Sequence, residues 1–190
     1  MTILVEGSLE FDFSAAIRAY KFDDPKTHGA GALKQVDFIV EWEKEIWLLE
    51  VKDPEDSAIP AQQRAAIRRK HRRNLQLKNM QATDAHLQKL AVYDEKLMVA
   101  YGEKDRDSFL YLYLRDQMQH KPLKFIVLIG MERLSTRILE TATKGLKRSC
   151  ALEGPFKGGW VRLYFQSIQV LNLSEWQDQY PQSPIKRLPT

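Results

Sequence analysis

Two neighbouring stretches of the chain have the apolar and polar pattern of a β-hairpin. Residues 35–42 and 45–53 are rich in β-branched and aromatic side chains, and only residues 43–44 separate them. If the turn is centred between positions 43 and 44, Asp37 lies directly across from Glu50. A four-residue loop keeps this pairing. A three-residue loop shifts it by one residue and moves Asp37 out of line with Glu50.

The two faces of the predicted hairpin differ in character. One face is apolar throughout and collects Phe38, Val40, Trp42, Trp47, Leu49 and Val51. The other face carries Asp37, Glu50 and Lys52 at its open end, with Ile39, Ile46 and Leu48 nearer the turn. Charges on such a half-buried face cost desolvation free energy unless something compensates them, and a divalent cation would do so. The alternative is a sheet edge that merely ends in charged residues.

The rest of the chain predicts helices around a small sheet. Ser8 can cap a helix that runs to about Lys21, although residues 9–13 also alternate as a strand. A long helical region is expected up to about Gln119, broken near Thr83 and Gly102, and its apolar last part, 107–119, should be a central buried helix. The remaining expected elements are a strand at 123–129, a helix at 132–148, and strands at 160–165 and 168–173.

This order of elements predicts an α/β or α+β fold, in which helices flank a small mixed sheet with the hairpin at its centre. We expect one domain over residues 1–180, because 190 residues make a proper core and leave no room for two. Residues 181–190 are proline-rich and basic, and we expect them to form a loose tail.

Composition narrows the class of protein. An apolar fraction of 44% and a charged fraction of 28% are ordinary for a soluble globular protein. No apolar run is long enough to span a bilayer, and the first residues lack the pattern of a signal peptide. A single cysteine, Cys150, excludes an intramolecular disulfide and a multi-cysteine zinc site. We therefore expect a cytoplasmic protein that does not associate with membranes.

The charged end of the hairpin suits metal-assisted chemistry. Carboxylates are hard oxygen ligands for Mg²⁺ or Mn²⁺, which bind through one or two of them together with a substrate phosphate. A lysine beside the cation can orient the attacking water or neutralise charge that develops on phosphorus. This division of roles fits the hydrolysis of a phosphodiester.

Asp37 followed by Glu50-Val51-Lys52 resembles the PD-(D/E)xK superfamily of restriction-endonuclease-like nucleases. The resemblance covers residues 30–53, and Val36 stands where the family pattern has proline, a common relaxation. It implies that Asp37 and Glu50 ligate the metal together with the backbone carbonyl of Val51. It also implies that Lys52 positions the attacking water.

The resemblance implies further site residues outside the hairpin. The family often adds a glutamate from the first helix, for which Glu10 is the candidate and Glu6 the alternative, although each also reads as an ordinary surface acid. A glutamine or lysine often lies on the helix after the E-x-K strand, and Gln62 and Gln63 are candidates. His28 could contact a phosphate, or be a solvated loop histidine.

A basic segment follows the hairpin. Residues 64–78 contain seven lysines and arginines and no acid. Like charges at helical spacing repel one another, so phosphates would stabilise this segment, whereas the alternative is a solvated helix face. The residues predicted to contact nucleic acid are Arg64, Arg68, Arg69, Arg72 and Arg73.

Together these features predict an Mg²⁺- or Mn²⁺-dependent nuclease that hydrolyses phosphodiester bonds of DNA, with an endonuclease favoured. Asp37, Glu50 and Lys52 are its expected catalytic residues. A homodimer is a further expectation, because cutting both strands often needs two sites. The alternatives are a catalytically silent nucleic-acid-binding or assembly subunit of the same fold, and an interaction domain whose basic helix meets an acidic protein.

Overall fold

The fold is α+β, with two sheets and three helices in the part of the chain that the structure describes. The structure, a computed structural model, describes residues 1–24, 26, 32–54, 56, 95–118, 120–132, 134–150 and 165–189. The larger sheet has the order β3-β4-β5-β6-β7, and the smaller sheet has the order β1-β2-β8. The strands are β1 (Ile3–Glu6), β2 (Leu9–Asp12), β3 (Arg18–Lys21), β4 (Phe38–Glu41), β5 (Ile46–Lys52), β6 (Leu123–Ile129), β7 (Ser167–Asn172) and β8 (Ile185–Arg187). The helices are α4 (Glu95–Leu114), α5 (Thr136–Ser149) and α6 (Leu173–Gln179).

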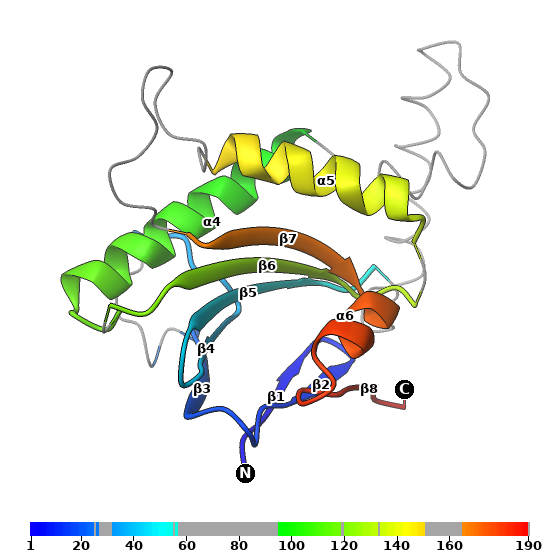
Figure 1. Ribbon diagram of the computed structural model, residues 1–190, viewed down its shortest axis with the longest axis horizontal. Coiled ribbons are helices and arrows are strands. Elements are labelled where there is room, and N and C mark those ends of the chain that lie inside the picture. The colour runs from blue at the N-terminus through cyan, green and yellow to red at the C-terminus, as the bar shows by residue number, and fades with distance from the viewer. Residues whose placement is uncertain are drawn as a thin grey trace.

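The larger sheet lies between two layers (Figure 1). α4 and α5 cover one of its faces, and α6 and the smaller sheet lie against the other. Alternate residues of β5 enter the two cores, with Ile46 and Leu48 on the helix side and Trp47 and Leu49 on the other side. Both faces of β5 are therefore buried, which explains its nearly continuous apolar sequence.

The predicted hairpin and its register are confirmed. β4 and β5 pair antiparallel from Phe38 opposite Leu49 to Glu41 opposite Ile46. At the turn, the Trp42 amide donates to the Glu45 carbonyl at 2.8 Å, which centres the turn between residues 43 and 44. The expected mixed sheet is confirmed as well, because β3, β4 and β5 run antiparallel, whereas β5, β6 and β7 run parallel.

The helix expected from Ser8 to Lys21 is wrong, and the alternative strand is confirmed. Leu9, Phe11 and Phe13 are all fully buried, as strict alternation requires, and residues 9–12 form β2. Ile17 would have faced the core in a helix, but it is 62% exposed. The strand pattern prevails because β2 can bury its apolar side chains against the larger sheet.

The expected break at Gly102 is also wrong, since α4 continues through it. A Cβ atom at position 102 would lie 2.8 Å from the Ser149 carbonyl oxygen, so the glycine allows α4 and α5 to approach closely. The segment 107–119 is not a central buried helix. The helix ends at Leu114, and Tyr113 and Leu114 are 65% and 69% exposed.

The later part of the chain follows the prediction more closely. The strand expected at 123–129 is β6, and the helix and strand expected at 132–148 and 168–173 appear as α5 and β7 with slightly shifted ends. The segment from Pro181 is not a loose tail, because β8 pairs with β2. The break near Thr83 and most of the strand expected at 160–165 lie outside the described residues.

Within the described residues, no helix combines the length and the apolar character needed to cross a membrane.

Where α4 packs against α5, it buries a titratable side chain. Asp105 is fully buried, and this burial raises its pKa to about 8. Cys150, at the end of α5, and Arg106 lower the pKa by smaller amounts. The neutral acid is therefore the form that the folded state prefers.

Asp105→Asn should remove a pH dependence of stability. A raised carboxyl pKa contributes stability that is complete below 3.8 and is lost as pH rises through about 8. Relative to wild type, the variant should therefore gain about 1–3 kcal/mol of unfolding free energy between about pH 5 and about pH 9. Denaturant titrations at both pH values measure this, and a difference that does not change with pH would contradict it.

Candidate active site

Asp37 lies where the backbone pairing between β4 and β5 stops. The ladder ends at Phe38, and the Asp37 side chain then takes over, because its Oδ2 accepts a hydrogen bond from the Val51 amide at 2.6 Å. The Asp37 carbonyl accepts from the Phe22 amide at 2.8 Å, just beyond β3. Asp37 is only 4% exposed, and the backbone on its two sides holds its carboxylate at Val51 and its carbonyl at Phe22.

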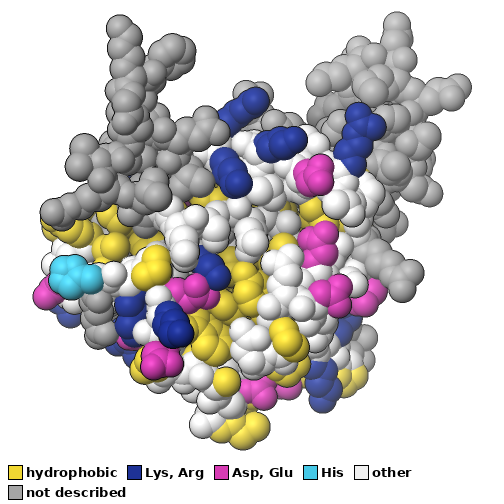
Figure 2. Space-filling view, viewed as in Figure 1, with side chains coloured by type: hydrophobic (Ala, Val, Ile, Leu, Met, Phe, Trp, Pro, Cys, Tyr) yellow, Lys and Arg dark blue, Asp and Glu magenta, His cyan; other side chains and the backbone are white. Residues whose placement is uncertain are grey.

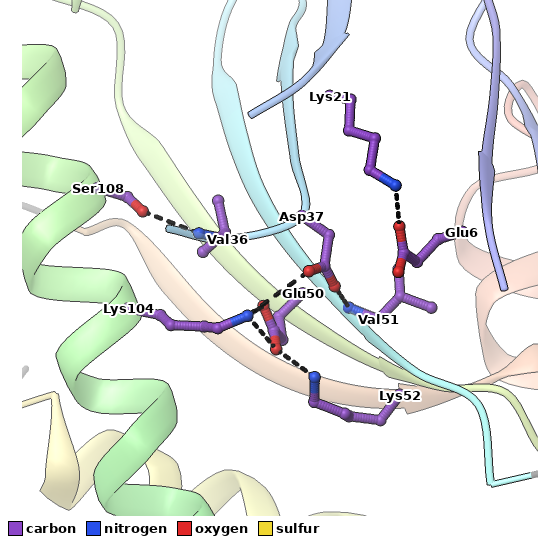
Figure 3. A network of polar contacts seen from close by, with 9 residues as sticks. All are labelled: Glu6, Lys21, Val36, Asp37, Glu50, Val51, Lys52, Lys104 and Ser108. Carbon is purple, nitrogen blue, oxygen red and sulfur yellow. Dashed lines mark hydrogen bonds and ion pairs between the residues drawn. The ribbon is translucent and has the colours of Figure 1, made fainter. Parts of the chain in front are cut away.

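Glu50 and Lys52 meet on the face of β5 that α4 covers. The Glu50 side chain has no exposure to solvent, and the Lys52 ammonium lies 2.7 Å from its Oε1. Lys52 itself is 41% exposed, at the open end of the strand. The hairpin register predicts that Asp37, Glu50 and Lys52 lie together, and they do so in the structure (Figure 3).

A second lysine, which the sequence did not single out, completes the site. Lys104 of α4 places its Nζ 2.8 Å from both carboxylate oxygens of Glu50 and 3.5 Å from Asp37 Oδ1. A glutamine or lysine is expected on the helix that follows Lys52, and α4 lies between β5 and β6 in the chain. Gln62 and Gln63, the candidates for that position, lie outside the described residues.

More charged residues surround this core (Figure 3). Glu6 of β1 forms an ion pair of 2.7 Å with Lys21 of β3, beside Asp37 and Val51. Asp23, just after β3, lies within electrostatic range of Asp37, Lys21, Glu6 and Lys104.

The expected acidic ligand from a first helix needs a correction. No helix forms at residues 8–21, and Glu10 lies on β2 of the smaller sheet, opposite Val5 and Lys186. Glu6 of β1, the alternative, is the one that lies beside the site. His28 and the five arginines between Arg64 and Arg73 lie outside the described residues, so their contacts with nucleic acid stay predictions.

The pKa shifts in the site are all upward. Burial, and then Asp37, raise the pKa of Glu50, although Lys52 and Lys104 oppose them. Burial lowers the pKa of Lys104, but Glu50 and Asp37 outweigh it and raise the pKa overall. The pKa of Asp23 is raised by burial and by Asp37. Upward shifts of acids and bases alike mean that the site favours additional positive charge.

α4 contributes two further polar groups. The Ser108 hydroxyl accepts a hydrogen bond from the Val36 amide at 3.1 Å, which fixes the chain just before Asp37. The Tyr101 hydroxyl is buried and has no hydrogen-bond partner among the described residues. Burial, Glu50 and Asp37 raise its pKa, so it stays protonated and can donate.

The donor set fits a hard divalent cation. The oxygens of Asp37 and Glu50 converge on one position, which the Lys104 ammonium now takes. Among the described residues, no group of three or more His, Cys, Asp or Glu side chains is arranged to hold a metal ion. Two carboxylates are nevertheless a suitable protein contribution for Mg²⁺, which usually keeps several waters.

Comparison of the chain with protein-family models, with curated proteins and with solved structures found no match.

We expect Glu50 and Lys104 to be strongly coupled in a double-mutant cycle. Glu50→Gln leaves Lys104 with only its longer contact to Asp37, and Lys104→Met leaves the buried Glu50 with Lys52 alone, whereas the double variant removes both charges. The coupling free energy should be about 1–3 kcal/mol, measured by denaturant unfolding in EDTA.

A second cycle on the neighbouring ion pair provides the matched control. Lys34 pairs with Glu103 of α4, and these side chains are 57% and 36% exposed. Their cycle, Lys34→Met with Glu103→Gln, should give less than about 1 kcal/mol. Equal coupling in the two cycles would contradict a special electrostatic role for the buried pair.

Proposed function

We propose that this protein is a metal-dependent nuclease that hydrolyses phosphodiester bonds of DNA, related in its chemistry to the PD-(D/E)xK superfamily. The observation that carries the proposal is the convergence of Asp37, Glu50 and Lys52 at the open end of one hairpin. Lys104 of α4 bridges both carboxylates there and marks a position for a cation. A solvated sheet edge would not bury Glu50 completely.

Asp37 and Glu50 would hold Mg²⁺ or Mn²⁺. In a strand, the N–H and C=O groups of one residue point to the same side, and the Val51 amide faces Asp37. The Val51 carbonyl therefore belongs on the same side, as a third oxygen ligand would require. When bound, the cation supplies positive charge for the scissile phosphate.

The two lysines have different roles in this proposal. Lys52 is the more exposed one, so its ammonium can orient the attacking water and still contact Glu50. Lys104 is 25% exposed, and a cation between the carboxylates would release its ammonium toward the phosphate oxygens. Both groups stabilise negative charge that develops in the transition state.

A basic surface supports a polyanionic substrate. Lys and Arg side chains gather on the outer face of α5 (Figure 2). On this helix Arg137, Lys144 and Arg148 are exposed, and Glu140 is the only acid. Such a surface gives salt-dependent affinity for phosphates that does not depend on base sequence. The arginines at 64–73, which lie outside the described residues, would add positive charge for such contacts.

One observation favours the second candidate, a catalytically silent nucleic-acid-binding subunit. Lys52 and Lys104 together balance the charges of Asp37 and Glu50, so the site is compensated without any metal. A silent subunit would bind nucleic acid but would gain no stability from a divalent cation.

Asp37→Asn and Lys52→Ala should each lower the cleavage rate by about 100-fold or more, because each removes a group that acts on the reacting atoms. The assay incubates plasmid DNA and labelled single strands with Mg²⁺, Mn²⁺ or EDTA. Cleavage should require the metal, and circular dichroism should show that the variants are folded.

Glu41→Gln is the matched control for these variants. Glu41 is a buried acid on the same hairpin, 5% exposed, but it pairs with Lys121 and Arg18 near the turn. We expect its cleavage rate to stay near that of wild type. Undiminished cleavage by clean preparations of Asp37→Asn or Lys52→Ala would refute the assignment.

Lys104→Met should increase the stabilisation that Mn²⁺ confers. The variant leaves the two carboxylates without their bridging ammonium, so a cation no longer has to displace it. Thermal unfolding in EDTA and in Mn²⁺ measures the effect, with no nucleic acid present. Lys121→Met, which removes a similarly buried lysine paired with Glu41 at 2.8 Å, should respond like wild type. If Mn²⁺ does not stabilise Lys104→Met, the result would favour the catalytically silent subunit over the nuclease.

A further inference from the structure

A cluster of polar contacts, which we call the clasp, lies at the end of β5 beside Lys52. It consists of Ser8, Asp53, Gly130 and Arg187, which come from four distant parts of the chain. Arg187 is the last residue of β8, and Asp53 directly follows Lys52. The clasp therefore joins the C-terminal strand of the smaller sheet to the strand that carries the site.

The contacts within the clasp are short and mutually consistent. Arg187 donates from Nη1 to Asp53 Oδ2 at 2.8 Å and from Nη2 to Asp53 Oδ1 at 3.2 Å, which is the two-pronged geometry of a strong arginine–carboxylate pair. The Ser8 hydroxyl accepts from Arg187 at 2.6 Å and donates to Asp53 Oδ2 at 2.6 Å. The Asp53 side chain is only 4% exposed, whereas that of Arg187 is 34% exposed, so the pair joins a buried carboxylate to a guanidinium at the surface.

Arg187 also acts on the backbone at Lys52. Its Nη2 donates to the Gly130 carbonyl at 2.5 Å, and the Gly130 amide donates to the Lys52 carbonyl at 2.7 Å. A Cβ atom at position 130 would lie 2.8 Å from Asp53 Oδ1, so only glycine lets the end of β6 approach this closely. The Arg187 guanidinium thus holds both Asp53, which follows Lys52 in the chain, and Gly130, whose amide bonds to the Lys52 carbonyl.

We propose that Arg187 is a positioning residue, which fixes the backbone at Lys52 so that the Lys52 ammonium reaches Glu50. Lys52 is 41% exposed, and its long side chain makes one ion pair of 2.7 Å to Glu50. Its direction therefore depends on the backbone from which it starts. As a role in the reaction, this inference rests on the proposed function; as a device that orders Lys52, it stands on the clasp alone.

The test compares Arg187→Ala and Arg187→Lys with wild type. In Arg187→Ala, kcat should fall about 10-fold while KM for DNA stays within about twofold, because a loosened Lys52 misplaces the reacting geometry without removing a substrate contact. Arg187→Lys keeps the positive charge but cannot form the two-pronged contact with Asp53, so its kcat should lie between those of wild type and Arg187→Ala. Gly130→Ala, which pushes Asp53 away, should reproduce the loss and provides a second route if Arg187→Ala does not fold.

Lys124→Ala is the control. Lys124 forms an ion pair of 2.8 Å with Glu45, which joins the start of β6 to the hairpin turn at the opposite end of the sheet. We expect its kcat and KM to stay within about twofold of wild type. If Arg187→Ala keeps the wild-type kcat, or if KM changes as much as kcat, Arg187 does not position Lys52 for the reaction.

Hydrogen exchange separates this inference from the nuclease proposal. The Gly130 amide and the segment around Lys52 should exchange at least about 10-fold faster in Arg187→Ala, whereas the hairpin near its turn should not change. Faster exchange in a protein that cleaves nothing would refute the nuclease and retain the ordering of Lys52 by Arg187. Unchanged exchange would refute the clasp's role whether or not the protein cleaves DNA.

Discussion

The Glu50 carboxylate has no contact with solvent, and its charge must be compensated within the protein. This one requirement explains much of the surrounding structure. α4 has to bring Lys104 to the sheet, and Gly102 lets α4 lie close enough to α5 to do so. The β4–β5 ladder has to stop at Phe38, because the side chain of the preceding Asp37 bonds to the Val51 amide instead of extending the ladder. A fully buried position in a strand ordinarily holds an apolar residue. An ionised glutamate at position 50 therefore lowers the stability of the folded state relative to an apolar side chain.

That cost is understandable if the site exists to hold positive charge. The folded protein supplies two ammonium groups of its own, which keep the carboxylates compensated while no other cation is bound. A divalent ion concentrates twice the charge at one point and would compete with Lys104 for the same oxygens. In that case the divalent ion displaces the Lys104 ammonium from the carboxylates, and the displaced ammonium stays near enough to contact a phosphate.

The sequence predicted the half of the site that is local. Alternation around a symmetrical turn predicted Asp37 opposite Glu50, and the observed register, with Phe38 opposite Leu49, agrees with that prediction. Lys104 could not be found in the same way, because it is 54 residues from Glu50 and no local pattern links a helix position to a strand. The first segment fits both a helix from Ser8 to Lys21 and a strand at 9–13, because Phe13, Ala16, Ile17 and Tyr20 have helical spacing. Only tertiary pairing decides between such readings, and it also makes a strand of the proline-flanked segment Ile185–Arg187.

The pairing of β2 with β8 has a kinetic consequence. The contact between Ser8 and Arg187 spans 179 residues, whereas the β4–β5 hairpin closes over a short turn. Loops of that length close slowly and at an entropic cost, so we expect the hairpin to form early and the smaller sheet to be completed late. Local opening should follow the reverse order, so that the smaller sheet separates before the β4–β5 hairpin does. A partly opened population, with an intact five-stranded sheet but a detached terminal strand, would therefore be the first non-native species on the unfolding route and the one that proteases meet.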